Sequence, residues 1–365
     1  MNKRITKYFS VTRSFTDPRW SVSERALFAK RLSFLIKANV PLLESMHMLQ
    51  NQTKSKSKKK VFDVIINDIS NGKRLSTSLE RFPKMFGDFA INLIKVGEAS
   101  GILDQNLQHL AHELHKQQAL RRKVIGALVY PVFITIATLG VTSLLTVYIF
   151  PKLLPIFSSL HVTLPFTTRV LMYVSNYLRN WGLLSLVGIV IFGFIFLTVR
   201  ASVERFHLLV DRLILKIPLV GKMLKSYNMA NICRTLGLLL KSGVRVVESL
   251  DITADTTRNL AYRGGLQNIA KGALKGEKIS KGLDRHQELF PDITSQMISI
   301  GESTGNLPET SLYLAEMYEA EVDESTRNLS TAIEPALMAF MGILVGFVAV
   351  SVITPIYSVT QHLTR

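Results

Sequence analysis

Three long apolar runs constrain this chain more than any other feature of its sequence. The runs 124–150 and 181–199 contain no Lys, Arg, Asp or Glu, and the run 332–357 contains a single charged residue, Glu334. As a helix rising 1.5 Å per residue, the first run reaches about 40 Å, against roughly 30 Å of hydrocarbon in a bilayer. Buried core helices are usually shorter than this, so the sequence predicts three transmembrane helices.

The distribution of basic residues predicts how these helices are oriented. The 365 residues are 47% hydrophobic, and 44 Lys and Arg outnumber 27 Asp and Glu, for a net charge of +17. Such an excess of basic residues could indicate nucleic-acid binding, but the basic residues lie where cytoplasmic segments of a membrane protein carry them, and no nucleic-acid-binding motif accompanies them. The loop 151–180 and the tail 358–365 hold only four basic residues: Lys152, Arg169, Arg179 and Arg365. By the positive-inside rule, 1–123 and 200–331 are cytoplasmic, with the N-terminus inside and the C-terminus outside.

The chain also repeats itself after 204 residues. The segment Gly97-Glu98-Ala99-Ser100-Gly101 falls on Gly301-Glu302-Ser303-Thr304-Gly305, and Pro131 falls on Pro335. The pairs Phe82-Pro83 and Phe290-Pro291 match only with an additional shift of four residues. Two copies of one module, each followed by a span, require a third span to return the chain to the cytoplasm.

Both modules are expected to be helical. Ser21 and Glu24 have the spacing of a capping box, Asn71-Gly72 suits a helix end, and no segment alternates with the period of a strand. We therefore predict an all-α polytopic membrane protein with two cytoplasmic bundles of about six helices each. The expected order is an extension (1–20), module (21–123), span (124–150), loop (151–180), span (181–199), module (200–331), span (332–357) and tail (358–365).

Two doubled motifs resemble those of the inner-membrane platform protein of type II secretion systems and type IV pilus assembly machines. One is the helix pair at 35–45 and 239–249, and the other is the Gly-Glu-x-Ser/Thr-Gly-x-Leu turn at 97–103 and 301–307. The resemblance implies a scaffold in the bacterial inner membrane that is not an enzyme and needs no cofactor. It also implies as partners a hexameric assembly ATPase, pilin or pseudopilin subunits, other inner-membrane assembly proteins and further copies of the chain.

The repeated turn has a structural and a functional interpretation. Its glycines permit tight backbone, Ser100 and Thr304 could cap the next helix, and Pro308 suits that helix's first turn. We favour this structural interpretation over direct contact with a partner. The candidate residues are Gly97, Glu98, Gly101, Gly301, Glu302 and Gly305.

Two other polar clusters admit alternatives. The run Lys54, Lys56, Lys58, Lys59 and Lys60 is expected to be a solvated loop, with contact to anionic lipid or an acidic partner as the alternative. His109, His112 and Glu113 could share a helix face and hold a metal. An exposed polar face without metal is the favoured interpretation of this second cluster.

Within the membrane, the prolines and one carboxylate are the candidates. Pro131 and Pro335 should kink their spans near the cytoplasmic boundary. Glu334 either snorkels to the headgroups or pairs inside a bundle with a basic group. Gly342 and Gly346 have the spacing of a close-approach helix motif.

Catalysis and solute transport have little support. The chain has no Gly-x-x-x-x-Gly-Lys-Ser/Thr loop for ATP, and no His-Glu-x-x-His, Cys-x-x-Cys or Gly-x-Ser-x-Gly motif. The alternative of a small-solute transporter built from two repeats is disfavoured, because three spans with one charged residue make a poor conduit.

Overall fold

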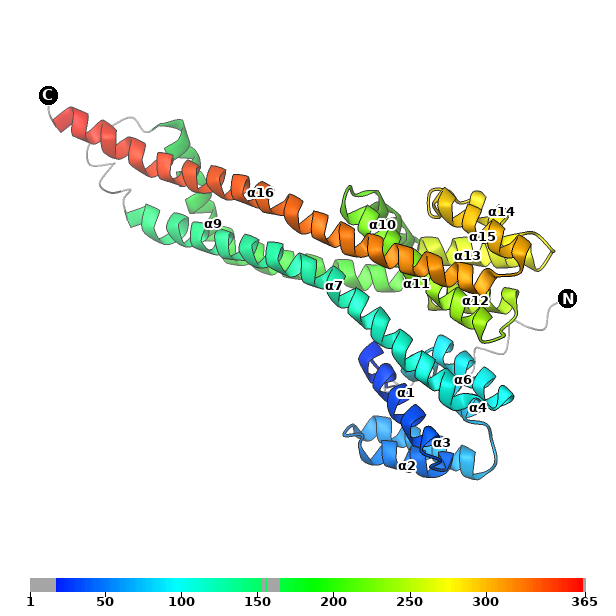
Figure 1. Cartoon of the computed structure of the whole chain (residues 1–365). Coiled ribbons are helices and arrows are strands. Elements are labelled where there is room, and N and C mark those ends of the chain that lie inside the picture. Colours follow the sequence, from blue (N-terminus) through cyan, green and yellow to red (C-terminus); the bar gives the residue numbers. More distant parts are fainter. Residues whose placement is uncertain (1–17, 153–154, 156–164, 364–365) are drawn as a thin grey trace. The chain divides into compact units, whose positions relative to one another are not determined.

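The computed structural model describes residues 18–152, 155 and 165–363, and within these it is helical with no strand (Figure 1). The predicted all-α class is therefore confirmed. The first module consists of six helices and the start of a seventh: α1 (Val22–Lys37), α2 (Leu42–Asn51), α3 (Lys56–Ser70), α4 (Leu75–Leu79), α5 (Pro83–Phe86), α6 (Asp88–Ser100) and α7 (Leu103–Leu144). Ser21 and Glu24 form the predicted capping box of α1.

The second module repeats this order. Its helices are α11 (Val220–Lys241), α12 (Val246–Thr256), α13 (Leu260–Ala273), α14 (Ile279–Asp284), α15 (Asp292–Thr304) and α16 (Leu307–Leu363), preceded by α10 (Glu204–Lys216). Helices α12 to α16 each begin 204 residues after their counterparts α2, α3, α4, α6 and α7, and α5 has no counterpart among them.

The constant offset corrects one prediction. The four-residue shift that pairs Phe82-Pro83 with Phe290-Pro291 is wrong, because α6 and α15 begin at Asp88 and Asp292 without any insertion. Phe290 instead takes the place of Phe86, and both rings are buried. The prolines play different roles, since Pro83 is the first residue of α5 whereas Pro291 is the N-cap of α15.

An aromatic cluster forms the centre of the first module. Trp20 lies 5.2 Å from Phe28 and 4.9 Å from Phe86 between ring centroids, and Phe62 completes the group. The second module centres on Tyr262, whose ring meets Phe290 edge-on at 5.5 Å and whose hydroxyl donates to the carbonyl of Leu289. Edge-to-face ring contacts of this kind add to the stabilisation from burial.

Both modules contain an ion pair with an arginine at the same repeat position, but the acidic partner comes from a different position in each. Arg81 contacts Asp68, and its counterpart Arg285 contacts Glu277. Asp68 corresponds to Gly272, where a Cβ would lie only 2.6 Å from the carboxylate of Glu277. The glycine thus leaves room for a carboxylate that arrives from a different position in the chain.

Contacts divide the chain into two units. The module unit contains Met1–Arg121 and Leu224–Ala320, and the span unit contains Arg122–Met223 and Glu321–Arg365. Helices α7 and α16 run through the predicted module boundaries at 123/124 and 331/332 without a break. In the module unit, Phe89 and Val96 of α6 pack against Leu239, Val244 and Ile252, so the first module contacts the second directly.

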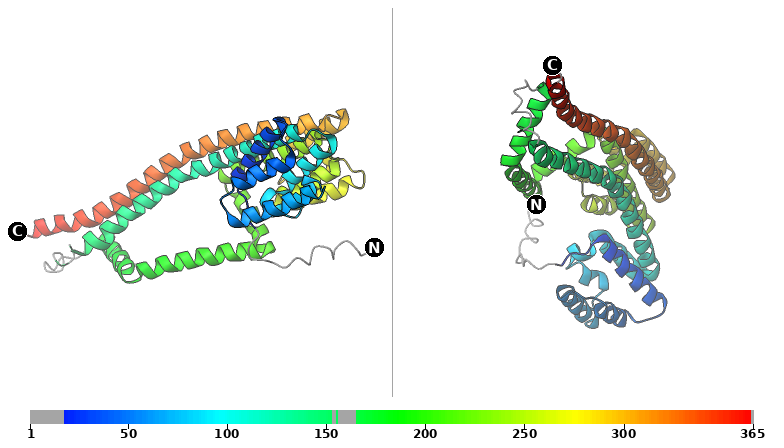
Figure 2. Two further views of the ribbon diagram at one scale, coloured as in Figure 1. Left: turned by 90° about the horizontal axis from the view of Figure 1, so that it is seen from below. Right: turned by 90° about the vertical axis from the view of Figure 1, so that its left-hand side faces the viewer.

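The span unit contains the three apolar helices. Candidate spans lie in Leu103–Lys152, α9 (Phe166–Ser202) and Leu307–Thr354, by length and composition. The portions of α7 and α16 in this unit run side by side (Figure 2), and Lys123 donates to both oxygens of Asp323 at 2.7 Å. Their large apolar side chains are exposed in the single chain, as expected of helices that face lipid.

Two hydroxyls of α9 satisfy backbone carbonyls of the other spans. Ser175 donates to the Thr146 carbonyl in η2 (Leu145–Ile149), a π-helical turn at the end of α7, at 2.7 Å. Thr168 donates to the Ser351 carbonyl at 2.8 Å. That carbonyl lacks its helical donor, because the residue four positions later is Pro355. These two hydrogen bonds hold α9 against the other two helices.

Candidate functional site

The repeated turn ends α6 and α15 in the same way. Gly101 and Gly305 have φ of 73° and 71°, in the left-handed region that glycine adopts without strain. The amides of Ile102 and Asn306 then donate to the carbonyls of Gly97 and Gly301, at 3.0 and 2.9 Å. These bonds close each helix and direct the chain into the following long helix.

The first glycine of each turn lets that long helix approach. A Cβ on Gly97 would lie 3.0 Å from the Cα of Leu103 and 3.1 Å from the Cβ of Asn106. A Cβ on Gly301 would lie 2.9 Å from the hydroxyl of Thr310. A larger residue would therefore push α7 or α16 away from the turn.

The glutamate of each turn caps a short helix elsewhere in its module. Glu98 accepts hydrogen bonds from the amides of Leu75 and Ser76 at 2.7 and 2.9 Å, and from the Ser76 hydroxyl. Glu302 does the same for Ile279 and Ser280. A carboxylate suits this position because it meets unsatisfied N–H groups and the positive end of the helix dipole. The geometry thus gives both glutamates a structural role, and contact with a partner stays a hypothesis.

One prediction about the turn is wrong. Ser100 and Thr304 do not cap the next helix, because their hydroxyls donate backwards to the carbonyls of Val96 and Ile300, at 2.6 and 2.8 Å. Short hydroxyl side chains commonly bond to the carbonyl four residues earlier. The expectation for Pro308 is confirmed, since it is the second residue of α16.

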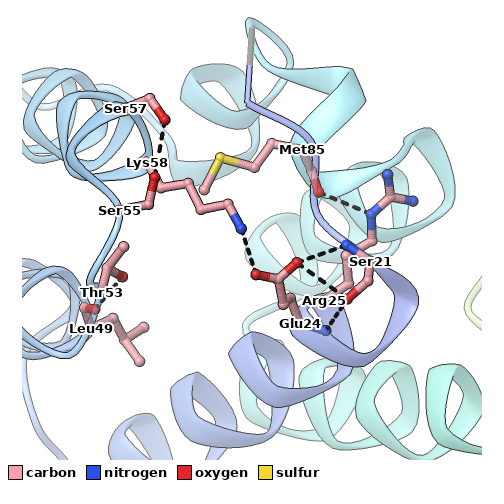
Figure 3. Close-up of polar contacts among 9 residues, drawn as sticks. All are labelled: Ser21, Glu24, Arg25, Leu49, Thr53, Ser55, Ser57, Lys58 and Met85. Carbon is pink, nitrogen blue, oxygen red and sulfur yellow. Dashed lines mark hydrogen bonds and ion pairs between the residues drawn. The ribbon is translucent and has the colours of Figure 1, made fainter. Parts of the chain in front are cut away.

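The lysine run also departs from its prediction as a loop. Only Lys54 precedes α3, and the other four lysines form its first residues. The Lys58 ammonium donates to the carboxylate of Glu24 in α1, and this pair joins α3 to α1 (Figure 3). Lys54, Lys56 and Lys60 remain exposed. The helix begins there despite unfavourable charge near its positive end, because the apolar side chains that follow pack in the core.

Among the described residues, the histidine cluster does not gather three ligand side chains in a group that could hold a metal ion. His109, His112 and His115 are exposed, as the favoured interpretation predicts. Glu113 is not part of an exposed face, because it is buried and lies 2.9 Å from the guanidinium of Arg234.

Arg234 is the buried charge that sequence reasoning missed. It lies in α11 and contacts Glu113 of α7 at 2.9 Å and Glu319 of α16 at 2.6 Å. Neither contact has the angle of a hydrogen bond, so charge attraction dominates. Burial raises the pKa of Glu113 to about 7, opposed by the attraction of Arg234. An arginine in the apolar stretch 229–240 was the available signal.

A cavity of about 350 Å³ opens beside this cluster in the module unit. Charged side chains from both modules line it, among them Arg25, Asp88 and Glu113 from the first and Arg234, Asp255 and Arg258 from the second. Arg25 also donates to the carbonyl of Met85 (Figure 3) and to the carbonyl of Lys84. Burial and the neighbouring Asp255 raise the pKa of Asp88. The module contact therefore combines an apolar patch with compensated buried charge.

The membrane candidates are exposed in the single chain. Glu334 is exposed in α16, and no basic group among the described residues forms an ion pair with it. Added Cβ atoms on Gly342 and Gly346 would meet nothing within 4 Å, so there is open space at both positions. Pro131 and Pro335 lie inside continuous helices, and the predicted kinks, like the two interpretations of Glu334, stay predictions.

Comparison with known proteins identifies a family with the same repeat. Residues 28–151 and 232–355 each match the family described as "Type II secretion system (T2SS), protein F". The chain is 31% identical to the type IV pilus assembly protein PilC of Pseudomonas aeruginosa, over 91% of this chain and 88% of the relative. It is 32% identical to PilC of Thermus thermophilus, over 94% and 84%. It is 29% identical to the type II secretion system protein F of P. aeruginosa, over 93% and 84%.

Both matched segments contain the turn and the span that follows it, so the repeat seen in the sequence is the repeat of this family. Together with the helical fold and the three candidate spans, the matches confirm the resemblance on which the sequence analysis relied. The chain belongs to the type II secretion system protein F family.

Proposed function

We propose that this chain is the inner-membrane platform of a machine that assembles type IV pili or secretion pseudopili. In this proposal it is not an enzyme: it couples a hexameric ATPase in the cytoplasm to the insertion of pilin subunits. The names of the relatives, type IV pilus assembly protein and type II secretion system protein F, support the machine class. The N-terminus is cytoplasmic and the C-terminus periplasmic in this arrangement, following the basic residues.

The continuity of α7 and α16 is the observation that carries the coupling. Each begins at a Gly-Glu turn in a module and ends in a span. Helices of 42 and 57 residues reach about 63 and 85 Å at 1.5 Å per residue. We infer that the unbroken helical backbone of each serves as a rod that carries a displacement of the module to the intramembrane end.

A helix break tests this coupling. Ala119 is exposed in α7 near the end of the module unit. A119P removes a backbone donor and kinks the rod, whereas A119L at the same site preserves the helix. We expect A119P to abolish filament assembly or secretion at normal abundance, membrane insertion and ATPase binding, and A119L to retain function. Normal assembly by A119P would exclude transmission through α7.

The exposed lysines before and at the start of α3 are the proposed contact for an acidic face of the ATPase. The variant K54E/K56E/K60E reverses three charges there, and K271E/K275E/K278E reverses three exposed lysines of the second module as a matched control. We expect the first variant alone to lose co-purification of the cognate ATPase at moderate salt. Loss with only the second variant would move the contact to the second module, and loss with neither would refute an electrostatic contact at both.

A further inference from the structure

Helix α10 lies between the second span and the described helices of the second repeat. It lies outside both segments that match the family, 28–151 and 232–355. It follows α9 directly: the uncharged run ends at Val199, Arg200 begins the charged segment, and α10 begins at Glu204. The helix therefore starts about one turn beyond the apolar part of a candidate span, which places it at the expected bilayer boundary.

One face of α10 is fixed against α9. Asp211 is buried and accepts a hydrogen bond from Arg200 at 2.9 Å, with the ring of His207 3.5 Å from its other oxygen. The rings of Phe196 and Phe206 meet edge-on at 5.5 Å. Contacts from two successive turns of α10 set its rotation, so the opposite face is determined as well.

That opposite face carries exposed leucines with exposed basic side chains beside them. Leu209 and Leu213 are 56% and 62% exposed, one helical turn apart. The side chains of Arg205, Arg212 and Lys216 are exposed on the same side, and Glu204 is the one exposed acid of the helix. This is the composition of a helix that lies in a bilayer interface, with leucines among acyl chains and basic groups at the phosphates.

The turn after α10 extends the apolar strip. Ile217 and Leu219 are 47% and 50% exposed, and Leu219 has φ of 64°. A Cβ on Gly221 would lie 2.3 Å from the carbonyl oxygen of Leu215, so only glycine fits where the chain turns back. The Gly221 amide donates to the Ile217 carbonyl at 2.7 Å. The turn thus holds two further apolar side chains in place beyond the end of the helix.

We propose that α10 and the turn after it form an interfacial anchor that binds the anionic lipid surface at the Arg200 end of α9. Two features favour a bilayer over a protein partner as the occupant. The apolar strip follows a span directly, so it lies at the interface in every copy of the chain, and basic side chains lie beside it. The anchor limits tilting and rotation of α9, because Asp211 and Phe206 connect it to the last turns of that helix. The proposal is independent of the ATPase and of pilin.

A fluorophore on Leu213 tests the anchor in the full-length protein. The labelled variant L213C is placed in nanodiscs of phosphatidylcholine with phosphatidylglycerol, and L274C, another exposed leucine, serves as the matched control. Burial raises the pKa of the native Cys233 thiol to about 12, so that thiol does not compete for label. We expect nitroxide-bearing lipids to quench the label at 213 and aqueous iodide to quench the label at 274.

Charge removal then tests the lipid class. Each lost basic residue should lower the ratio of inserted to free helix by about fivefold in anionic discs. R205Q/R212Q/K216Q should therefore lose lipid quenching at 213, whereas K271Q/K275Q/K278Q should not. The proposal would be overturned if iodide, and not the nitroxide-bearing lipids, quenched the label at 213 in L213C with its basic residues intact. Energy transfer between labelled copies without lipid quenching would overturn it too, by identifying a second chain as the occupant.

Discussion

Replacing Glu98 tests whether the repeated turn is a folding device. In E98A, the amides of Leu75 and Ser76 lose a charged acceptor while both residues stay buried. Hydrogen bonds to charged groups contribute about 1.5–3 kcal/mol each, so losing two costs at least about 3 kcal/mol locally. Since about 1.4 kcal/mol corresponds to tenfold, the opening equilibrium of the first turn of α4 should rise about 100-fold.

Hydrogen exchange of the full-length protein measures this effect amide by amide. In E98A the amides of Leu75 and Ser76 should exchange about 100-fold faster, because their protection reports local opening. The amides of Ile279 and Ser280, which Glu302 still caps, provide the internal control. The conservative E98Q keeps one oxygen acceptor, so its effect should be smaller.

The reciprocal variant completes the test. E302A should raise exchange at Ile279 and Ser280 and leave the first module unchanged. If exchange at Leu75 and Ser76 in E98A stays within about threefold of wild type, which is less than 1 kcal/mol, then the capping argument is refuted. Faster exchange throughout both modules would instead show that the turn controls global rather than local stability.

Burial and charge lead to three further predictions. The pKa of Glu113 is about 7 in the folded protein and 4.5 when unfolded, so the free energy of unfolding should fall as pH rises between these values, by up to about 1.4 kcal/mol per pH unit. E113Q should flatten the dependence of Tm on pH in nanodiscs, and an unchanged slope would contradict this. E334Q should abolish filament assembly at normal abundance if the carboxylate pairs with a basic group inside a bundle, whereas wild-type assembly would leave only snorkelling. Reporter fusions after Ser175 and Arg365 should be periplasmic and one after Ala261 cytoplasmic, and a cytoplasmic signal after Ser175 would overturn the topology.

The start of α3 was predicted wrongly because the internal repeat was not used to locate it. Five lysines in seven residues suggested a loop, because charge and solvation dominate a local pattern. The offset of 204 aligns Ser55 with Asn259, which is the N-cap of α13 and accepts from two amides of its first turn. Transferring that stronger start signal between copies would have placed the beginning of α3 correctly.

Sequence alone determined the features that depend on local patterns. Apolar runs of 19 to 27 residues with at most one charged residue predicted the three spans, and helical spacing without period two predicted the all-α class. Asn39 and Gly243 occupy the same place in the two copies, both residue types tolerate positive φ, and the two have φ of 59° and 84°. Such features are settled within a few residues by backbone sterics and by transfer of apolar side chains out of water.

Only the tertiary structure decided which distant groups meet. The acceptor for the α4 amides comes from Glu98, 22 residues further along, and Arg234 finds acids on α7 and α16. The outward face of α10 is known because Arg200 contacts Asp211 and Phe196 contacts Phe206. These pairings depend on how helices pack, and many residues of suitable charge compete for each partner in the sequence. Packing selects one arrangement because a charge or an amide that is buried without its partner loses its hydration and receives nothing in exchange.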